Sequence, residues 1–424
     1  MSSPTSANRL RRNRSSGITE MRSRSSISED PEQPREARPP SPPGPEANAP
    51  PPEEEVTHLR LAAHYSGLVL SSFIGCLIRL GLIGLATYDT PIIFALAWSQ
   101  GVGCGIMGLS LSRKNEIIAI YPPIYTFLTT GIAGSTTTFS SWMLGGYLSF
   151  SNFDKYNRNG LHDTVDGVAY SLSTFCIALA SLRFGEHSAS VLPALSSLRR
   201  TKRPPIPDRL PTTSTSSEET SIELQQQHAQ QVHQVSQGQS AGDPEKSKAL
   251  FHISMIPSST PLIDLVWISI AFISYLIVLL LYFLGPKSWR HDVTFPLLLS
   301  PPGSIIRFFL SRYNTRKRFI DKFPIGTFTS NLLATVVISV CFAEQRRPTT
   351  FFNGLRCNAL NGIQQGFCGC LSTVSTFAVE SRSIKKWYHS WLYIGFSVIL
   401  GHLLVLAIVG GIGWGQGYAD VCVG

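Results

Sequence analysis

Hydrophobic residues in this 424-residue chain gather into nine long runs that are separated by polar segments. Each run has about 20 residues or more with little charge, which is the length of an α-helix that crosses the hydrocarbon core of a bilayer. The pattern therefore predicts an all-α, polytopic membrane protein. The nine predicted spans are 66–86, 91–111, 121–150, 165–184, 262–284, 293–310, 323–342, 355–378 and 391–412.

Two long polar segments flank the first four spans. Residues 1–58 are rich in Arg, Ser, Pro and Glu with almost no aromatic residues, and residues 189–258 contain a Gln- and Ser-rich tract. Because such segments cannot bury enough apolar surface to fold, we predict a disordered cytoplasmic tail and a disordered cytoplasmic linker. The other predicted parts are a first four-helix unit, a bridging transmembrane helix, a second four-helix unit and a C-terminal tail, at 59–188, 259–285, 286–416 and 417–424.

The two sets of four spans carry the same sequence features in the same order. GIAGSTTTFSSW at 131–142 matches GFCGCLSTVSTF at 366–377, and Arg79 of GCLIR matches Arg307 of GSIIR. The offsets, 366 − 131 = 235 and 307 − 79 = 228, differ by a few residues only. Because the bridging helix adds one crossing, the second copy must run antiparallel to the first. We therefore predict two inverted four-helix repeats with a site near the membrane midplane.

Charge supports a membrane protein and predicts its orientation. Only 15% of the residues are charged, against about 25% in an average protein, which argues against a soluble enzyme. The 36 basic and 27 acidic residues give a net charge of +9, which we assign to cytoplasmic flanks and not to nucleic-acid binding. Short loops are more basic on the side of the N-terminus, which predicts a cytoplasmic N-terminus and an external C-terminus. The basic residues on that side are Arg113, Lys114, Arg312, Arg316, Lys317, Arg318, Lys322, Arg382, Lys385 and Lys386, against Lys155, Arg158, Lys287, Arg290, Arg346, Arg347 and Arg356 opposite.

Cysteine usage and phosphate motifs exclude other classes of protein. Most cysteines lie in apolar runs as small packing residues, so we predict no disulfide framework. The chain also lacks the G-x-x-x-x-G-K-[ST] loop of ATP-driven pumps. The cysteines inside apolar runs are Cys76, Cys104, Cys176, Cys341, Cys368 and Cys370.

Gly, Ser and Thr crowd together in the third span of each half, at 131–141 and 366–376. This composition is poor for an uninterrupted helix, so we predict a helix break in each. Broken backbone at membrane depth is tolerated where it lines a cavity, and its free carbonyl and amide groups can hold ions. The alternative is that the small residues merely allow close helix packing.

Few polar side chains lie within the spans. Arg79 and Arg307 are expected to face water or a partner, with snorkelling to an interface as the alternative, while Glu380 lies at the end of its helix. Asn331 lies in mid-span, where its amide can donate to an anion or to a neighbouring helix. Aromatic rings next to the predicted breaks pack against neighbours or meet an anion with their positive edges. These rings belong to Phe139, Trp142 and Phe377.

Together these motifs resemble the Fluc/CrcB fluoride channels, and the fused form with a bridging helix resembles the fungal fluoride exporters (FEX). The resemblance covers about 67–184 and 262–412. It implies an antiparallel, two-lobed channel in the plasma membrane that passes fluoride selectively and passively, works as a monomeric fused pseudo-dimer and confers fluoride resistance. Fluoride that enters as neutral HF dissociates in the cytoplasm, and the inside-negative potential drives it out.

The resemblance also assigns roles to individual residues. The pore amide of the family falls on Asn331 in the second half but on Gln100 in the first, and Arg79 and Arg307 belong to vestibules. The family's aromatic pair is intact as Phe139 with Phe377. The other pair is degraded to Trp142 with Val374, which predicts one working and one vestigial pore. The remaining pore residues are Tyr393, Ser397, Tyr170 and Thr174, and the backbone of Gly134, Thr137, Gly369 and Ser372 is expected to hold a structural sodium ion.

Two other functions are compatible with parts of this pattern. A proton-coupled transporter of small molecules or drugs can be built from antiparallel repeats, but it is expected to need an exchangeable intramembrane carboxylate, for which Glu380 is the one candidate. A scaffold that recruits partners through its long tails would need residues 1–58 and 189–258, so their deletion distinguishes it from a channel. The fluoride channel explains more of the motifs than either alternative.

Overall fold

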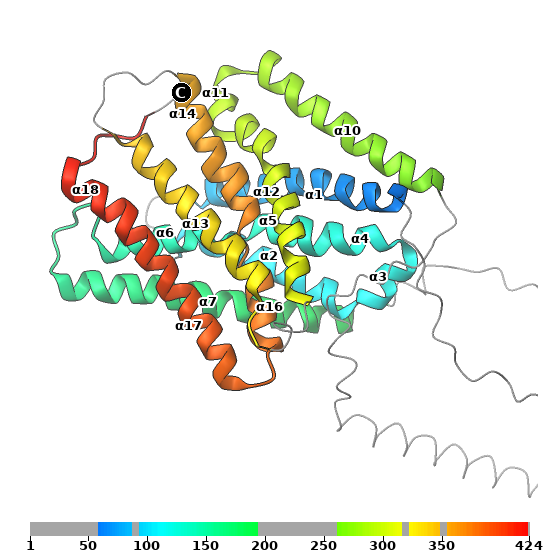
Figure 1. Cartoon of the computed structure of the whole chain (residues 1–424), viewed down its shortest axis with the longest axis horizontal. Coiled ribbons are helices and arrows are strands. Elements are labelled where there is room, and N and C mark those ends of the chain that lie inside the picture. The colour runs from blue at the N-terminus through cyan, green and yellow to red at the C-terminus, as the bar shows by residue number, and fades with distance from the viewer. Residues whose placement is uncertain (1–57, 87–92, 194–260, 316–321, 348–353, 423–424) are drawn as a thin grey trace, which may run out of the picture. The chain divides into compact units, whose positions relative to one another are not determined.

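The computed structural model describes residues 58–86, 93–193, 261–315, 322–347 and 354–422 (Figure 1). Within these ranges the chain is helical and has no β-strand, which confirms the prediction of an all-α protein. The predicted N-terminal tail and most of the linker lie outside the described residues.

The first half begins with one long helix and then contains an interrupted one. The elements are α1 (His58–Leu85), α2 (Ala95–Ser112), α3 (Lys114–Ile120), α4 (Pro122–Thr126), the π-helix η1 (Phe127–Ala133), α5 (Gly134–Thr136), α6 (Phe139–Phe150) and α7 (Gly160–Val191). Helix α7 continues three residues past the predicted linker boundary at 188, because Arg113 donates hydrogen bonds to the carbonyls of Ala189 and Leu192 and holds this end.

The bridging helix and the second half follow a similar plan. The elements are α10 (Pro261–Leu284), α11 (Lys287–Trp289), the π-helix η3 (Arg290–Thr294), α12 (Phe295–Ser311), the 3₁₀-helix η4 (Arg312–Thr315), α13 (Ile325–Gln345), α14 (Gly354–Asn361), the π-helix η5 (Gly362–Cys368), α15 (Gly369–Leu371), α16 (Ser375–Ser383), α17 (Trp387–Val405), the π-helix η6 (Leu406–Gly410) and α18 (Gly411–Gln416).

Six helical stretches in the described residues are long and apolar enough to cross a membrane. Three predicted spans are not among them. Helix α2 has 18 residues that include several Gly and Ser, and each third span is divided into short pieces by its break. The six stretches are His58–Leu85, Gly160–Val191, Pro261–Leu284, Lys287–Asn314, Ile325–Gln345 and Trp387–Gln416.

Helix α10 packs against the rest of the chain along one narrow seam. Its buried residues are Asp264, Ala271 and Val278, one every seven residues, and the helix lies along α1 at the edge of the molecule (Figure 1). At its first turn a carboxylate oxygen of Asp264 lies 3.2 Å from Nη1 of Arg60 and accepts a 2.5 Å hydrogen bond from the hydroxyl of Tyr121. This buried ion pair anchors the bridging helix to the first half.

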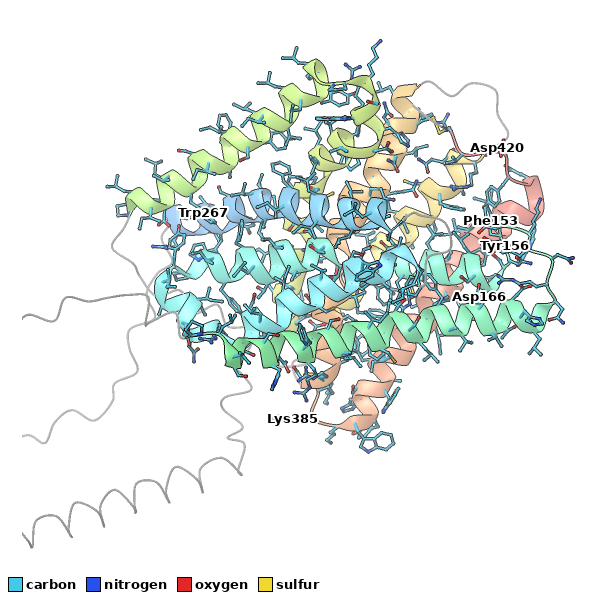
Figure 2. All side chains as sticks on the ribbon, turned by 180° about the vertical axis from the view of Figure 1, so that it is seen from behind. Phe153, Tyr156, Asp166, Trp267, Lys385 and Asp420 are labelled. Atoms are coloured by element: carbon cyan, nitrogen blue, oxygen red, sulfur yellow. A yellow bond between two sulfur atoms is a disulfide. The ribbon has the colours of Figure 1, made fainter. Side chains whose placement is uncertain are left out.

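The C-terminal segment is fixed to the helices by a disulfide between Cys357 and Cys422. Backbone amides of Ala419 and Cys422 also donate to carbonyls at the end of α13. The prediction of no disulfide framework did not anticipate this bond: Cys357 lies near the start of the predicted span 355–378 and Cys422 in the predicted C-terminal tail, and the fold brings these two segments together. Figure 2 shows Asp420 at the same end of the molecule as Phe153, Tyr156 and Asp166.

Two glycines at matching positions allow helices to approach the interrupted segments closely. A Cβ atom on Gly75 of α1 would lie 2.8 Å from the carbonyl oxygen of Ile132, and one on Gly303 of α12 would lie 2.3 Å from the carbonyl oxygen of Phe367. Since both neighbours are backbone atoms, they have little freedom to move. Each half therefore uses a glycine to pack its first helix on its own interrupted segment.

We expect Gly303→Ala to lower the free energy of unfolding by about 1 to 3 kcal/mol, because the added methyl overpacks this contact. The matched control is Gly395→Ala in α17, where a Cβ would meet nothing within 4 Å and the change should be within about 1 kcal/mol of neutral or stabilising. Thermal unfolding of the purified chain in detergent measures both. Equal unfolding temperatures for the two variants would contradict the close packing.

Candidate functional site

Both predicted helix breaks are present. Helix α5 ends at Thr136 and α6 begins at Phe139, and α15 ends at Leu371 while α16 begins at Ser375. The backbone after each short helix is extended, with φ −92° and ψ 147° at Thr137 and φ −89° and ψ 156° at Ser372. These two residues occupy equivalent positions in the two halves, because their separation, 372 − 137 = 235, is the offset between the matching motifs at 131–142 and 366–377.

Each break caps the helix that follows the other break. The hydroxyl of Thr137 accepts hydrogen bonds from the backbone amides of Ser375 and Val374, at 3.1 and 3.3 Å. In return, the hydroxyl of Ser372 accepts a 3.1 Å hydrogen bond from the amide of Ser140. A side-chain oxygen at a helix N-terminus satisfies amides that have no partner within the helix. The two halves therefore exchange their helix caps.

The two mid-span amides hold the backbone of the breaks. Asn331 donates to the carbonyl of Thr373 at 3.2 Å and accepts from its amide at 2.8 Å. Gln100 makes the same pair of bonds with Thr138, at 2.8 and 3.3 Å. Gln100 thus preserves this backbone pairing although it departs from the motif. The role of Asn331 toward an anion stays a prediction.

Two buried arginines reach across from one half to the other. Arg79 of α1 is 1% exposed and donates to the carbonyl of Gln365 in the second half. Arg307 of α12 is 3% exposed and donates to the carbonyls of Gly134, at 2.5 Å, and Thr130 in the first half. Their guanidinium groups are therefore buried against broken backbone and do not extend to an interface. Arg307 also lines a cavity, and its assignment to a vestibule stays a prediction.

The predicted sodium ligands do not fit a sodium ion in this arrangement. Nη1 of Arg307 binds the carbonyl of Gly134 and lies 3.3 Å from the carbonyl of Ser372. Backbone carbonyls are suitable ligands for a cation, but two of the four expected oxygens already accept hydrogen bonds from a guanidinium. The other two expected ligands are the carbonyls of Thr137 and Gly369.

The aromatic residues near the breaks form one cluster. The rings of Phe139 and Phe377 meet edge to face with centroids 5.4 Å apart. Trp142 lies 5.4 Å from Phe139 and 6.4 Å from Phe377 and stacks on Phe175. Val374 is fully buried in the same apolar core. The structure therefore brings the intact pair together, and the indole of Trp142 fills the space beside it.

A buried polar network around Glu380 adjoins this cluster. One carboxylate oxygen of Glu380 accepts hydrogen bonds from Asn314 and Thr327, both at 2.7 Å, and the other accepts one from the hydroxyl of Tyr393 at 2.8 Å. The ring of Tyr393 lies 5.0 Å from that of Phe377. The predicted residue Ser397 donates to the carbonyl of Tyr393 at 2.6 Å. Sequence analysis placed Glu380 only at a helix end and missed Asn314 and Thr327.

Among the described residues, the first half has no equivalent of this network. The offsets of the repeat, 235, 231 and 228, place Gly145, Leu96 and Ala86 where the second half has Glu380, Thr327 and Asn314. A Cβ on Gly145 would lie 2.3 Å from the hydroxyl of Tyr170, so a larger side chain has no room there. Comparison of the two halves at these offsets is the sequence signal that could have identified the network.

Of the remaining first-half residues, Tyr170 lines a separate cavity and Thr174 is fully buried. The ring of Tyr170 packs on Phe94 with centroids 4.2 Å apart, and Thr174 donates to the carbonyl of Tyr170 at 2.7 Å. A cavity of about 680 Å³ is lined by Tyr170, Phe94 and Asp166. It lies at the end of the molecule that Figure 2 marks with Phe153, Tyr156 and Asp166.

A cavity of about 120 Å³ reaches the break of the second half from the opposite side. Thr373 and Thr376 of that break line it, next to Thr327 of the Glu380 network and the guanidinium of Arg307. Lys114 and Arg312 line it as well, among side chains that are mostly apolar. Hydroxyls and positive charges suit an anion, and Thr376 of the lining directly precedes Phe377 in the sequence.

Comparison with known proteins agrees with this geometry. Residues 294–411 match the family model described as CrcB-like protein, Camphor Resistance (CrcB). The protein named fluoride-specific ion channel FluC 1 from Streptococcus pneumoniae serotype 4 is 35% identical over 111 residues, which cover 24% of this chain and 89% of that protein. No solved structure matches the chain.

Longer matches cover both halves. Fluoride export protein 1 of Schizosaccharomyces pombe is 28% identical over 360 residues, which cover 83% of this chain and 96% of that protein. Fluoride export protein 1 of Neurospora crassa is 25% identical over 410 residues, which cover 84% of this chain and 68% of that protein. With the broken helices, the buried arginines and the aromatic pair in place, the chain belongs to the CrcB/FluC family of fluoride channels.

Proposed function

We propose that this protein is a fluoride-selective, passive channel that exports cytoplasmic fluoride and so confers fluoride resistance. The observation that carries the proposal is the similarity to a FluC fluoride channel, which is 35% identical to this chain over 111 residues that cover 89% of that channel. It is supported by the contacts among Phe377, Tyr393 and Glu380, which lie within residues 294–411 that match the CrcB family model. No phosphate-binding loop is present in the sequence to couple transport to ATP.

The chemistry of the site suits a small, strongly hydrated anion. Such an ion gives up water only where hydrogen-bond donors replace it, and hydroxyls and amides at Thr373, Thr376 and Asn331 can supply them. The basic residues Lys114, Arg307 and Arg312 raise the local concentration of anions at the cavity. An inside-negative potential favours exit of fluoride by about 2.3 kcal/mol per charge for each 100 mV.

Nine spans in two inverted repeats form part of the proposal. Its support is the set of equivalent contacts at similar offsets: the exchanged caps from Thr137 and Ser372, offset by 235, and the amide pairs of Gln100 and Asn331, offset by 231. Helix α10 then adds one crossing of the membrane, so that the second half runs antiparallel to the first. In this architecture one chain supplies both lobes, so a monomer suffices.

We further propose one working pore and one vestigial pore. In favour of this, the pairing of Phe139 with Phe377 adjoins a carboxylate network, whereas the other path has Gly145 in place of the carboxylate and Val374 in place of an aromatic ring. The indole of Trp142 is 1% exposed and packed against three rings. A side chain packed in this way leaves little room for an ion.

The proposed orientation is a cytoplasmic N-terminus and an external C-terminus in the plasma membrane. Disulfides persist on the oxidising side of a membrane and are rare in the cytosol. The bond between Cys357 and Cys422 therefore supports an external position for the C-terminus, in agreement with the greater positive charge of the loops on the opposite side.

Fluoride efflux from liposomes tests the function directly. With the purified full-length chain in the membrane and a potassium ionophore present, fluoride measured by electrode should leave the liposomes, and chloride under the same conditions should not. Efflux should need no proton gradient, since the mechanism is passive. Equal chloride flux or a strict need for a proton gradient would contradict the proposal, and the second result would favour a proton-coupled transporter.

Substitutions in the aromatic cluster test the single pore. Phe377→Ala should reduce fluoride efflux by about tenfold or more, which corresponds to a barrier raised by at least about 1.4 kcal/mol, because it removes the ring between Phe139 and Tyr393. Trp142→Phe, the matched control, keeps a ring at the vestigial position and should leave efflux within a few-fold of wild type. The reverse ranking would mean that the two paths have been exchanged.

Cysteine chemistry at the surface of intact cells tests the orientation. A membrane-impermeant thiol reductant followed by an impermeant maleimide should label Cys357 and Cys422 on intact cells, because the disulfide then faces outward. The variant with both residues changed to Ser is the control for labelling of other cysteines. Labelling that appears only after the membrane is permeabilised would place the C-terminus in the cytoplasm.

A further inference from the structure

A buried positive charge lies between the two broken helices. Nη1 of Arg307 is 2.5 Å from the carbonyl oxygen of Gly134, which belongs to the first half, and 3.3 Å from that of Ser372, which belongs to the second. Its other terminal nitrogen donates to the carbonyl of Thr130 and lies 3.4 Å from the hydroxyl of Ser135. One guanidinium therefore binds the broken backbone of both halves.

The fold is shaped to admit this group. A Cβ atom on Gly134 would lie 2.6 Å from Nη2 of Arg307 and 2.7 Å from the central carbon of its guanidinium, so a larger residue at 134 would displace the guanidinium from this place. The planar guanidinium is always charged and is more weakly hydrated than an ammonium, which makes it the cation best suited to a buried site. The carbonyls of broken helices carry partial negative charge that a cation neutralises.

The same oxygens belong to the set that the family resemblance assigns to sodium. A sodium ion on the carbonyls of Gly134 and Ser372 would lie next to the guanidinium and share its acceptors. Two positive charges within a few ångströms of each other repel strongly where water is scarce. The geometry therefore allows one cation at these oxygens, and the chain already supplies it.

We propose that the guanidinium of Arg307 takes the place of the sodium ion, so that the two lobes are held together by a cation that the chain itself carries. The integrity of the fold then does not depend on sodium in the surroundings. This inference stands on the contacts of Arg307 and not on fluoride conduction, so each can fail without the other.

Arg79 provides a matched comparison. It is equivalent to Arg307 by the repeat offset and equally buried, and it lies against Gly369, where a Cβ would be 2.0 Å from its Nη1. Arg79 donates, however, to the carbonyl of Gln365 and the sulfur of Cys76, both outside the expected sodium set. Loss of Arg79 should therefore weaken the fold without opening a sodium site.

The test combines metal analysis with thermal unfolding of the full-length chain in detergent. After exchange into buffer with N-methylglucamine as the only cation, the wild-type protein should retain no sodium above background. Its unfolding temperature should differ by less than about 2 °C between sodium, potassium and N-methylglucamine buffers. Retention of about one sodium per chain, or an unfolding temperature that rises by several degrees with sodium alone, would overturn the proposal.

The arginine variants make the test specific. Arg307→Ala should unfold at a lower temperature than wild type, and sodium should restore several degrees of the loss because the vacated oxygens then accept the ion. Arg79→Ala should also unfold earlier but show no recovery with sodium. A folded Arg307→Ala variant that is indifferent to sodium would contradict the idea that these oxygens form a cation site. If that variant does not fold, the sodium content of the wild-type protein decides the matter.

Discussion

The rest of this structure depends on one contact, the crossing at which the helix break at Thr137 meets the helix break at Ser372. At the crossing, the hydroxyl of Thr137 caps the helix that begins at Ser375, and the hydroxyl of Ser372 caps the helix that contains Ser140. Unpaired backbone amides and carbonyls are costly away from water, so neither half can satisfy its own broken backbone alone. The two lobes therefore depend on each other for basic hydrogen bonding as well as for packing.

This dependence explains which features the two halves share and which they do not. The helix caps and the amide pairs at the crossing are made to backbone atoms, so Ser372 can replace Thr and Gln100 can replace Asn without loss of these bonds. The contacts around Glu380 are made between side chains. The residues found at the equivalent first-half positions, Gly for Glu380, Leu for Thr327 and Ala for Asn314, cannot make them. The backbone contacts thus tolerate divergence between the two halves, whereas the side-chain network around Glu380 is found in only one half of the described residues.

Much of the fold could be predicted from sequence because it rests on local signals. The length of apolar runs indicated helices, and the crowding of Gly, Ser and Thr located both breaks. Other features depend on partners far apart in the chain. The acceptors of Arg307, the donors to Glu380 and the disulfide between Cys357 and Cys422 are not encoded by spacing. The sequence motif assigns Trp142 to a path separate from that of Phe139 and Phe377. In the structure the three rings form one cluster, a contact between distant residues that the motif does not contain.

The central claim is that a single fluoride path passes the break of the second half, and selective modification of that break tests it most directly. Thr376 and Ser141 are equivalent by the offset of 235 and are both partly buried. Each is replaced by Cys in a background with Cys176→Ser, and fluoride efflux is measured before and after treatment with a negatively charged thiol reagent. The account predicts that modification at position 376 stops efflux and that modification at 141 leaves it nearly unchanged. Block at 141 with full efflux at 376, or partial block at both, would contradict it.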